Sequence, residues 1–538
     1  NFNTIHNYKY TVGTEIFCLY FFFRKMYYQI LFLFLVPLIF VVLGVRIQPP
    51  KSLQDFTQKR KELLAKEATL SLGGSIQLSS LEQTANKFIM KHKFAELDRG
   101  FKDITEFLPA ASFLKISKDM EKRQLFKLLQ KLPKGAVLHG HDTALVSAKY
   151  VVKNITYRDN LYLKVDKNEV SEMRFLRHAP EGNEWVSAKD IRCQKGVNYN
   201  NWMTKQLTLH DEYVGLSVND VWKKFIGLFI KITPMLTYLP VWKDHFYQTL
   251  KEFYDDNVSY LEFRGTLPEL YDLNGMTLKE IDACGVYVEV LAKFKKEYVK
   301  NNKFFDAKFI YAPLRLVDDK KFDEYIKIAK ELKQKYPNFI AGVDLVGQED
   351  LGQPLSKFTQ GLLDLKNANF DLFFHAGETK WSGSPTDKNL ADAVLLGTKR
   401  IGHGYAITKH PKVLQMVKNQ NIGIEICPIS NQVLGLVGDL RNHPLASLIM
   451  NEYPVVISSD DPGLWGATGV TYDWYETFVG IASRDQDLRL LKKLALNSIE
   501  QTSLDETRKK KLLEDWQKRW DDYVKSVPNI LNQNKKPK

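Results

Sequence analysis

Short apolar runs alternate with amphipathic stretches through most of this 538-residue chain. Each run is bounded by turn or charged residues, which is typical of a buried strand, and segments such as 321–335 and 389–396 have helical periodicity. Strands and helices in alternation predict an α/β fold, here a (β/α)8 barrel over residues 132–527. The expected strands are residues 136–138, 258–263, 305–311, 339–345, 372–374, 400–402, 422–426 and 455–458.

Three segments lie outside this alternation. Residues 48–131 are charged and amphipathic, which predicts an N-terminal helical extension. The segment of about residues 143–220 is rich in Tyr, Asn, Lys and Arg. A structureless loop of that length is uncommon in a compact domain, so we expect a small inserted domain after the first strand. Residues 528–538 form a polar tail.

The extreme N-terminus has the pattern of a targeting segment. Met26 is the first methionine, Arg24 and Lys25 precede it, and residues 27–45 are almost uninterruptedly apolar. Residues 26–47 therefore resemble a secretory signal peptide, and their length also permits a retained signal anchor. We expect a secreted protein, with a signal-anchored or lysosomal one as the alternative, and interpret residues 1–25 as translated upstream sequence.

The composition narrows the range of partners. The chain has 76 Lys and Arg against 63 Asp and Glu, a net charge of +13, which favours polyanions such as glycosaminoglycans outside the cell. No aromatic and basic recognition module is evident, so we expect no nucleic acid partner. After the expected signal peptide the cysteines are Cys193, Cys284 and Cys427, an odd count with no CxxC spacing. Sequons at Asn154 and Asn257 fit a secreted glycoprotein.

Polar clusters in a fixed order follow the expected strands. His139 and His141 end the first strand, where side chains two residues apart share one face. His375 and Asp460 end two later strands in the same way. A single His-x-His pair is more often two ordinary surface or core histidines. Three imidazoles and a carboxylate at strand ends instead match a catalytic zinc, which keeps a position open for water and lowers its pKa to about 7.

Three more side chains in these clusters are suited to acid–base chemistry. Glu378 lies three residues after His375 and can pass a proton to a ring nitrogen. His403, between two glycines, can orient an attacking hydroxide or take its proton. Asp461 directly follows Asp460 and could bind a substrate nitrogen. Taken singly, Glu378 and Asp461 would more often be solvated loop carboxylates, but the shared context favours a hydrolytic site.

The sequence around these residues resembles the adenosine deaminases, and especially their secreted branch, the adenosine deaminase-related growth factors. The resemblance runs from about residue 50 to about residue 527. It is carried by residues 132–141, 375–379, 400–404 and 459–462, and by 256–262, 342–347, 427–433 and 439–444.

The resemblance implies zinc-dependent hydrolysis of adenosine and 2′-deoxyadenosine to inosine or 2′-deoxyinosine and ammonia. It makes Glu378 the proton donor to purine N1 and His403 the group that handles the hydroxide. Asp461 would bind N7, the backbone of Gly347 would bind N3, and Asp142 would contact the ribose. Trp222 would cover the substrate, or else simply anchor an amphipathic helix. The implied zinc ligands are His139, His141, His375 and Asp460.

Some features leave alternatives open. Leu314 and Gln348 stand where some relatives have histidine, and Cys193 has no nearby partner for the disulfide that relatives carry in the insertion. The resemblance also implies that the N-terminal extension mediates a homodimer and that the insertion binds a receptor or polyanion. A growth factor that uses the barrel mainly as a scaffold is one alternative function. Another amidohydrolase, such as an adenine or nucleotide deaminase, is a further one.

Overall fold

The computed structural model describes residues 48–180, 184–300 and 303–533 of the chain. The expected signal peptide of residues 26–47 lies outside them. Two compact units divide the chain, residues 1–66 and 67–538. Helix α2 (Leu53–Leu70) begins in the first unit and buries none of its side chains. No helix within the described ranges is both long and apolar enough to cross a membrane.

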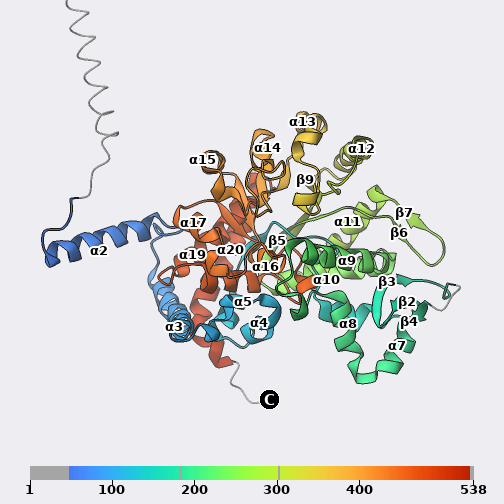
Figure 1. Cartoon of the computed structure of the whole chain (residues 1–538), viewed down its shortest axis with the longest axis horizontal. Coiled ribbons are helices and arrows are strands. Elements are labelled where there is room, and N and C mark those ends of the chain that lie inside the picture. Colours follow the sequence, from blue (N-terminus) through green and yellow to red (C-terminus); the bar gives the residue numbers. More distant parts are fainter. Residues whose placement is uncertain (1–47, 181–183, 301–302, 534–538) are drawn as a thin grey trace, which may run out of the picture. The chain divides into compact units, whose positions relative to one another are not determined.

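The second unit is built around parallel strands that close into a barrel (Figure 1). They form two four-stranded sheets, in the orders β1-β5-β8-β9 and β10-β11-β12-β13, and every neighbouring pair is parallel. Isolated bridges Val343↔Leu372 and Gly140↔Asp460 close the two seams between the sheets. The (β/α)8 barrel is therefore confirmed. Its strands are β1 (Gly135–Val137), β5 (Val258–Gly265), β8 (Asp306–Tyr311), β9 (Ile340–Val343), β10 (Phe373–Ala376), β11 (Arg400–His403), β12 (Gly423–Ile426) and β13 (Val455–Ile457).

Helices follow the strands and cover the barrel from outside. Helix α12 (Asp319–Lys335) shows why such segments fold this way. The Asp318 side chain caps its first turn by accepting from the Lys321 N–H, and Phe322, Ile326, Ala329 and Leu332 form one buried stripe. Figure 1 shows α12 to α15 in succession around the outside. The outer helices are α10 (Leu239–Asp255), α11 (Glu280–Glu297), α12, α13 (Thr359–Asn367), α14 (Asn389–Leu395), α15 (Pro411–Asn419), α17 (Leu445–Met450) and α19 (Leu488–Glu500).

The segment between β1 and β5 adds a small antiparallel sheet, in the order β3-β2-β4. Its strand β3 packs on helix α9, and the backbone N–H of Leu209 donates to the Leu464 carbonyl, 2.6 Å away, so the segment belongs to the same compact unit as the barrel. Cys193, exposed on α7, is a free thiol. The elements are β2 (Leu161–Asp166), β3 (Glu169–Phe175), β4 (Trp185–Ser187), α7 (Ala188–Lys195), α8 (Tyr199–Leu207) and α9 (Val218–Leu236), followed after β5 by the hairpin β6 (Leu270–Tyr271) and β7 (Thr277–Leu278).

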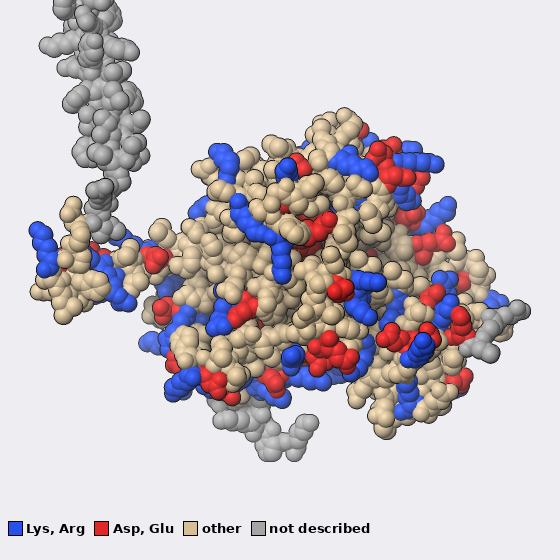
Figure 2. Space-filling view, in the orientation of Figure 1, with Lys and Arg blue, Asp and Glu red and all other residues tan. Residues whose placement is uncertain are grey.

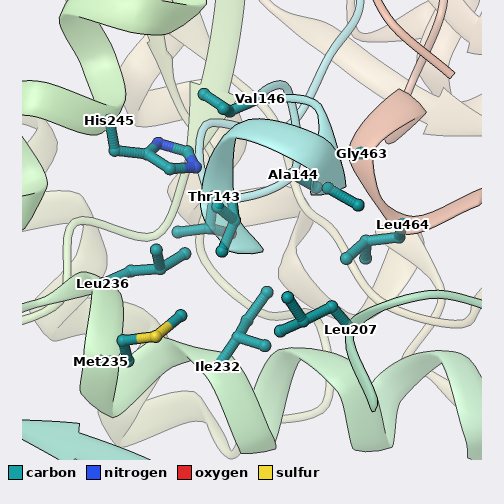
Figure 3. Close-up of a pocket in the computed structure, with 12 residues that line it drawn as sticks. Thr143, Ala144, Val146, Leu207, Ile232, Met235, Leu236, His245, Gly463 and Leu464 are labelled. Carbon is teal, nitrogen blue, oxygen red and sulfur yellow. The ribbon is translucent and has the colours of Figure 1, made fainter. Parts of the chain in front are cut away.

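A small internal cavity lies where this segment meets the barrel (Figure 3). Its volume is about 20 Å³, enough for one water, and side chains of Leu207, Ile232, Met235 and His245 line it. Burial lowers the pKa of His245 to about 3, so its ring is neutral at physiological pH. The cavity contains none of the expected metal ligands and is too small for a nucleoside.

The N-terminal helices α3 and α5 pack against the C-terminal helix α20. Ser79 and Glu82 form a capping box at the start of α3. Glu82 also accepts from Trp520 Nε1 at 2.9 Å and pairs with Lys492 at 2.6 Å. This polar contact joins three helices that are distant in sequence. The helices of this region are α3 (Ser80–Lys102), α4 (Phe113–Met120), α5 (Gln124–Lys131) and α20 (Glu506–Gln533).

Lys, Arg, Asp and Glu are interspersed over the face shown in Figure 2. The excess positive charge of the chain is therefore not gathered into a single stripe on this face.

The Glu82 contact generates a pH-dependent prediction. Burial raises the pKa of Glu82, but Lys492, the Ser79 N–H and Trp520 outweigh it and lower the pKa from 4.5 to about 2. A depressed folded-state pKa gives stability that is present above pH 4.5 and is lost as the pH falls toward 2. Glu82→Gln should lower the free energy of unfolding by about 1–2 kcal/mol at pH 7, with a smaller difference at pH 3, as measured by urea denaturation.

Glu331→Gln is the matched control, because Glu331 is exposed on α12. It should leave stability unchanged at both pH values. A Glu82→Gln variant as stable as the wild type at pH 7 would contradict the prediction.

Candidate active site

The ends of three barrel strands bring His139, His141, His375 and Asp460 together. One ligand atom from each lies within 4.8 Å of the others. His139 Nε2 and His141 Nε2 are 3.2 Å and 3.1 Å from the same oxygen, Asp460 Oδ1. The backbone holds this arrangement directly, since the His141 N–H donates to the Asp460 carbonyl and the Asp460 N–H donates to the His139 carbonyl, both at 3.2 Å. Closing the barrel therefore also assembles the cluster.

The cluster fits a metal ion. His139 Nε2 and Asp460 Oδ1 are buried and have no hydrogen-bond partner among the described residues. Buried polar atoms are seldom left unpaired, and a cation between them would satisfy both. Three imidazole nitrogens and one carboxylate oxygen are the donors that a catalytic zinc site uses. All four residues predicted as ligands from the sequence thus share one site.

Carboxylates behind the histidines fix their orientation. His139 Nδ1 contacts Glu425 Oε2 at 2.7 Å, and His375 Nδ1 contacts Asp344 Oδ2 at 2.6 Å. Burial raises the pKa of Asp344, but His375 and Arg264 outweigh it and hold the pKa below its ordinary value. An ionised carboxylate at Nδ1 keeps the proton there and turns the free Nε2 toward the metal position.

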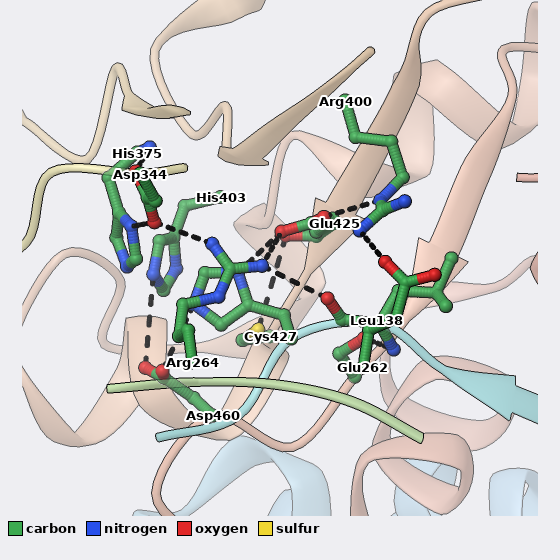
Figure 4. Close-up of polar contacts among 12 residues, drawn as sticks. Leu138, Glu262, Arg264, Asp344, His375, Arg400, His403, Glu425, Cys427 and Asp460 are labelled. Carbon is green, nitrogen blue, oxygen red and sulfur yellow. Dashed lines mark hydrogen bonds and ion pairs between the residues drawn. The ribbon is translucent and has the colours of Figure 1, made fainter. Parts of the chain in front are cut away.

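Two buried arginines connect these carboxylates (Figure 4). Arg264 donates to Asp344 Oδ2 at 2.7 Å and to Glu425 Oε2 at 2.6 Å. Arg400 donates to Glu425 Oε1 and to Glu262 Oε2, both at 2.6 Å. All five side chains are at most 1% exposed. This network was not predicted from the sequence, although a charged residue inside an expected buried strand, such as Glu425 between Ile424 and Ile426, indicates it.

Glu378 lies beside the cluster and is suited to carry a proton. Its side chain is almost fully buried, and its Oε1 is 3.6 Å from His403 Nε2. Burial and the neighbouring charges of Asp460 and Glu349 raise the pKa of Glu378 well above its ordinary value. The Glu378 N–H donates to Glu349 Oε2 at 2.6 Å, which fixes the backbone of this loop. Glu378 therefore holds its proton more tightly than an exposed glutamate does.

Backbone strain is concentrated at two residues of the site. His403 has φ +60° and Asp460 has φ +56°, in the left-handed region that non-glycine residues seldom adopt. Such residues cost on the order of 1–3 kcal/mol each and persist where the surroundings hold them. The neighbouring Gly402 is also constrained, because a Cβ there would lie 3.1 Å from His139 Cε1 and 3.2 Å from the His375 Cα.

Asp142 and Asp461 lie at the rim of the same barrel end. Tyr287 donates to Asp142 Oδ2 at 2.8 Å, and burial raises the pKa of Asp142 to about 7. Asp142 lies directly over Gly265, the last residue of β5, where a Cβ would collide with its carboxyl group. Asp461 is 1% exposed, and its Oδ1 has no hydrogen-bond partner among the described residues.

Trp222 and Gly347 belong to the loops and helix above the barrel. Trp222, on α9, is 6% exposed and packs edge-on against Phe225, which stacks on Trp465. Helix α9 is thereby held against the turn that follows Asp461. Gly347 has φ +106°, and Leu314 lies 3.9 Å from where its Cβ would be. Leu314 is half exposed, whereas Gln348 Nε2 donates to Asn219 Oδ1 at 3.1 Å and joins this loop to α9.

Comparison with known proteins decides the family. The adenosine deaminase model matches residues 204–519, and the adenosine/AMP deaminase N-terminal model matches residues 32–129. The chain belongs to the adenosine deaminase family. It is 44% identical over 490 residues to the adenosine deaminase of Phlebotomus duboscqi, covering 89% of this chain and 94% of that protein. It is 38% identical over 501 residues to adenosine deaminase 2 of Homo sapiens, covering 91% and 97%.

A solved structure supports the fold of this adenosine deaminase family member. The zinc-bound amidohydrolase from Burkholderia ambifaria aligns with a TM-score of 0.52 at 18% identity, over 75% of this chain and 94% of that one. The family resemblance and the enzyme class, a hydrolase, are thus confirmed. Neither the described structure nor these relatives support the alternative of a growth factor with the barrel as a scaffold.

The network behind the ligands can be tested through metal affinity. Asp344→Asn should weaken metal binding by about 10–100-fold, because the amide cannot hold the proton on His375 Nδ1 as a carboxylate does. Competition with a chromophoric chelator measures the dissociation constant. Asp387→Asn is the matched control, since it removes a buried carboxylate 2.8 Å from His410 Nε2, outside the cluster. Equal affinities in the two variants would contradict the assigned role of Asp344.

Proposed function

We propose that the chain hydrolyses adenosine and 2′-deoxyadenosine to inosine or 2′-deoxyinosine and ammonia, with zinc held by His139, His141, His375 and Asp460. The observation that carries this proposal is the buried Glu378, with its raised pKa, next to a three-histidine, one-aspartate cluster. Deamination of a purine needs these two elements together, a source of hydroxide and a proton donor for the ring. The names of the relatives and the zinc in the amidohydrolase structure support the same reaction.

The residues divide the reaction between them. Zinc, when bound, would lower the pKa of a water molecule to about 7 and so supply hydroxide. Glu378 donates its proton to N1 as the water oxygen bonds to C6, which leaves a tetrahedral carbon. The C6–N bond then breaks and the amino group leaves as ammonia with one proton of the water. The other water proton returns Glu378 to its acid form, and the 6-oxo purine remains.

Other side chains would orient the nucleoside. Asp461 is assigned to N7, the backbone of Gly347 to N3, and Asp142 to a ribose hydroxyl. The buried carboxyl of Asp142 favours a hydroxyl over a phosphate, because an ionised Asp142 would repel the negative charge of the phosphate. This is the reason to prefer a nucleoside over a nucleotide. Trp222 is assigned to cover the purine, a role consistent with its place on α9 facing the turn after Asp461.

The activity is tested directly with purified protein and a substrate panel. Adenosine and 2′-deoxyadenosine should lose their ultraviolet absorbance as inosine products form, whereas adenine and adenosine monophosphate should react far more slowly. A chelator should abolish turnover and added zinc should restore it. A folded, zinc-loaded protein that leaves adenosine unchanged would overturn the proposal.

Substitution of Glu378 tests the proton donor. Glu378→Gln should keep the metal but lower kcat by about 10²–10⁴-fold, because the amide has no acidic proton for N1. Metal content by mass spectrometry and kcat on adenosine are measured together. Wild-type turnover in the metal-loaded variant would remove Glu378 from this role.

We further propose a secreted homodimer. The apolar side chains Leu53, Phe56, Leu63 and Leu64 of α2 are exposed, and an unburied apolar face of this kind is suited to a second copy. Asn154 is exposed and open to glycosylation, whereas the Asn257 amide is engaged by the Gln130 carbonyl at 2.9 Å and by Arg519 at 3.2 Å. The net charge of +13 supports binding to glycosaminoglycans or to an acidic receptor surface.

Removal of α2 tests the dimer. Deletion of residues 48–70 from the mature chain should halve the mass measured by light scattering while adenosine turnover persists, because the deleted helix contributes no side chain to the site. The quadruple variant that changes the four apolar side chains of α2 to serine serves as the companion. A mass that stays the same in both would contradict the assignment of α2 to the interface.

A further inference from the structure

Two sequence motifs not used by the proposed function, residues 427–433 and 439–444, meet behind His403. Asn431, on helix α16 (Pro428–Val433), lies between two histidines. Its Nδ2 is 3.2 Å from His403 Nδ1, and its Oδ1 is 2.9 Å from His443 Nε2. At the far end, the Leu445 N–H donates to His443 Nδ1 at 3.0 Å. These three hydrogen-bonded side chains are buried from solvent, since the exposed fractions are 0% for Asn431, 1% for His403 and 2% for His443.

The far end fixes the proton on His443. A backbone N–H can only donate, so His443 Nδ1 accepts and carries no hydrogen. Burial lowers the pKa of His443 to about 3, which leaves the ring neutral. A neutral imidazole has one N–H, so in His443 it is on Nε2 and points to Asn431.

The Asn431 amide fixes the proton of His403 in the same way. Asn431 Oδ1 accepts from His443 Nε2–H, so the amide NH₂ is the group that faces His403. An NH₂ group has no lone pair to accept a hydrogen, so it donates to His403 Nδ1. The Nδ1 of His403 is therefore unprotonated, and the single proton of the neutral ring is on Nε2.

The protonated nitrogen faces the reacting groups. His403 Nε2 is 3.6 Å from Glu378 Oε1 and 3.8 Å from Asp460 Oδ2. Two neighbouring contacts hold Asn431 in place between the histidines. The Ile429 N–H donates to Asp473 Oδ1 at 3.3 Å. Gln432 Nε2 donates to the Ala111 and Gly438 carbonyls at 3.1 Å. Helix α16 is thus anchored on both sides of Asn431.

We infer that Asn431 and His443 are positioning residues that hold His403 in its Nε2–H tautomer. His403 then presents a hydrogen-bond donor to the pocket. If the chain carries out the proposed deamination, this donor would bind the oxygen that adds to purine C6. Because Nε2 already carries a hydrogen, it has no lone pair with which to take the water proton. Of the two roles that the sequence left open for His403, orientation of the hydroxide or removal of its proton, the geometry selects orientation.

The tautomer is measured on the full-length, zinc-loaded protein labelled with ¹⁵N histidine. Nitrogen NMR distinguishes protonated from unprotonated ring nitrogens, and the His403 signals are those lost in His403→Gln. The expected result for the wild type is a protonated Nε2 and an unprotonated Nδ1 in both His403 and His443. A protonated Nδ1 in His403 overturns the inference, whether or not the protein turns over adenosine.

Asn431→Asp tests the consequence for catalysis. A carboxylate only accepts, so it draws the proton of His403 to Nδ1 and leaves Nε2 as a bare acceptor. We expect kcat on adenosine to fall by about 10²–10⁴-fold, the range of a misplaced catalytic proton, with KM changed by less than about threefold. The nitrogen spectrum should show the proton moved to Nδ1.

Asn442→Asp is the matched control, because it makes the same amide-to-acid change directly beside His443 on an exposed side chain that does not contact His403. It should keep the wild-type tautomer and lose much less kcat. Equal kinetics and equal spectra in the two variants would overturn the inference. If Asn431→Asp does not fold, the wild-type spectrum still decides. A wild type with the expected tautomer but no adenosine turnover would refute the proposed function alone.

Discussion

A buried network of opposite charges inside the barrel is the interaction on which the rest of the site depends. Arg264 and Arg400 hold Asp344, Glu425 and Glu262 by contacts of 2.6–2.7 Å, and none of the five is solvated. Removing one partner from a buried ion pair typically costs about 3–5 kcal/mol, because the other charge stays buried. The network is therefore stable only when complete. Its carboxylates in turn hold His139 and His375, so the same contacts fix the fold and two histidines of the candidate metal cluster.

The closure of the barrel serves the chemistry in a second way. Backbone hydrogen bonds between His139, His141 and Asp460 form one seam of the barrel, and the same three residues belong to the candidate metal cluster. Asp460 at this seam and His403 at the end of β11 adopt left-handed backbone angles, a strain that the surrounding strands can hold. The cluster is built on strand ends, while Glu378, Asp461 and Asp142, which are proposed to meet the substrate, lie on the adjoining loops.

The barrel and its cluster of polar side chains could be predicted from the sequence, because the strand ends of a parallel barrel converge. Apolar runs located the eight strands, and polar residues directly after them, such as His375 and Asp460, had to meet at one barrel end. Glu425 and Arg264 were missed, since a charged residue inside an apolar run has no partner visible in the sequence. The contact between Asn431 and His443 could not be predicted, because 12 residues and a turn separate them in the sequence. The insertion was expected from its length and composition, but nothing in its sequence indicates how β3 packs on α9.

The proposed deamination requires the four strand-end residues to hold a metal next to the purine. Anomalous diffraction at the zinc edge, from crystals of the zinc-loaded protein soaked with inosine, tests it most directly. We expect one zinc peak bonded to His139, His141, His375 and Asp460, with inosine N1 facing Glu378 and N7 facing Asp461. A zinc peak elsewhere, or a purine bound away from these residues, would contradict it.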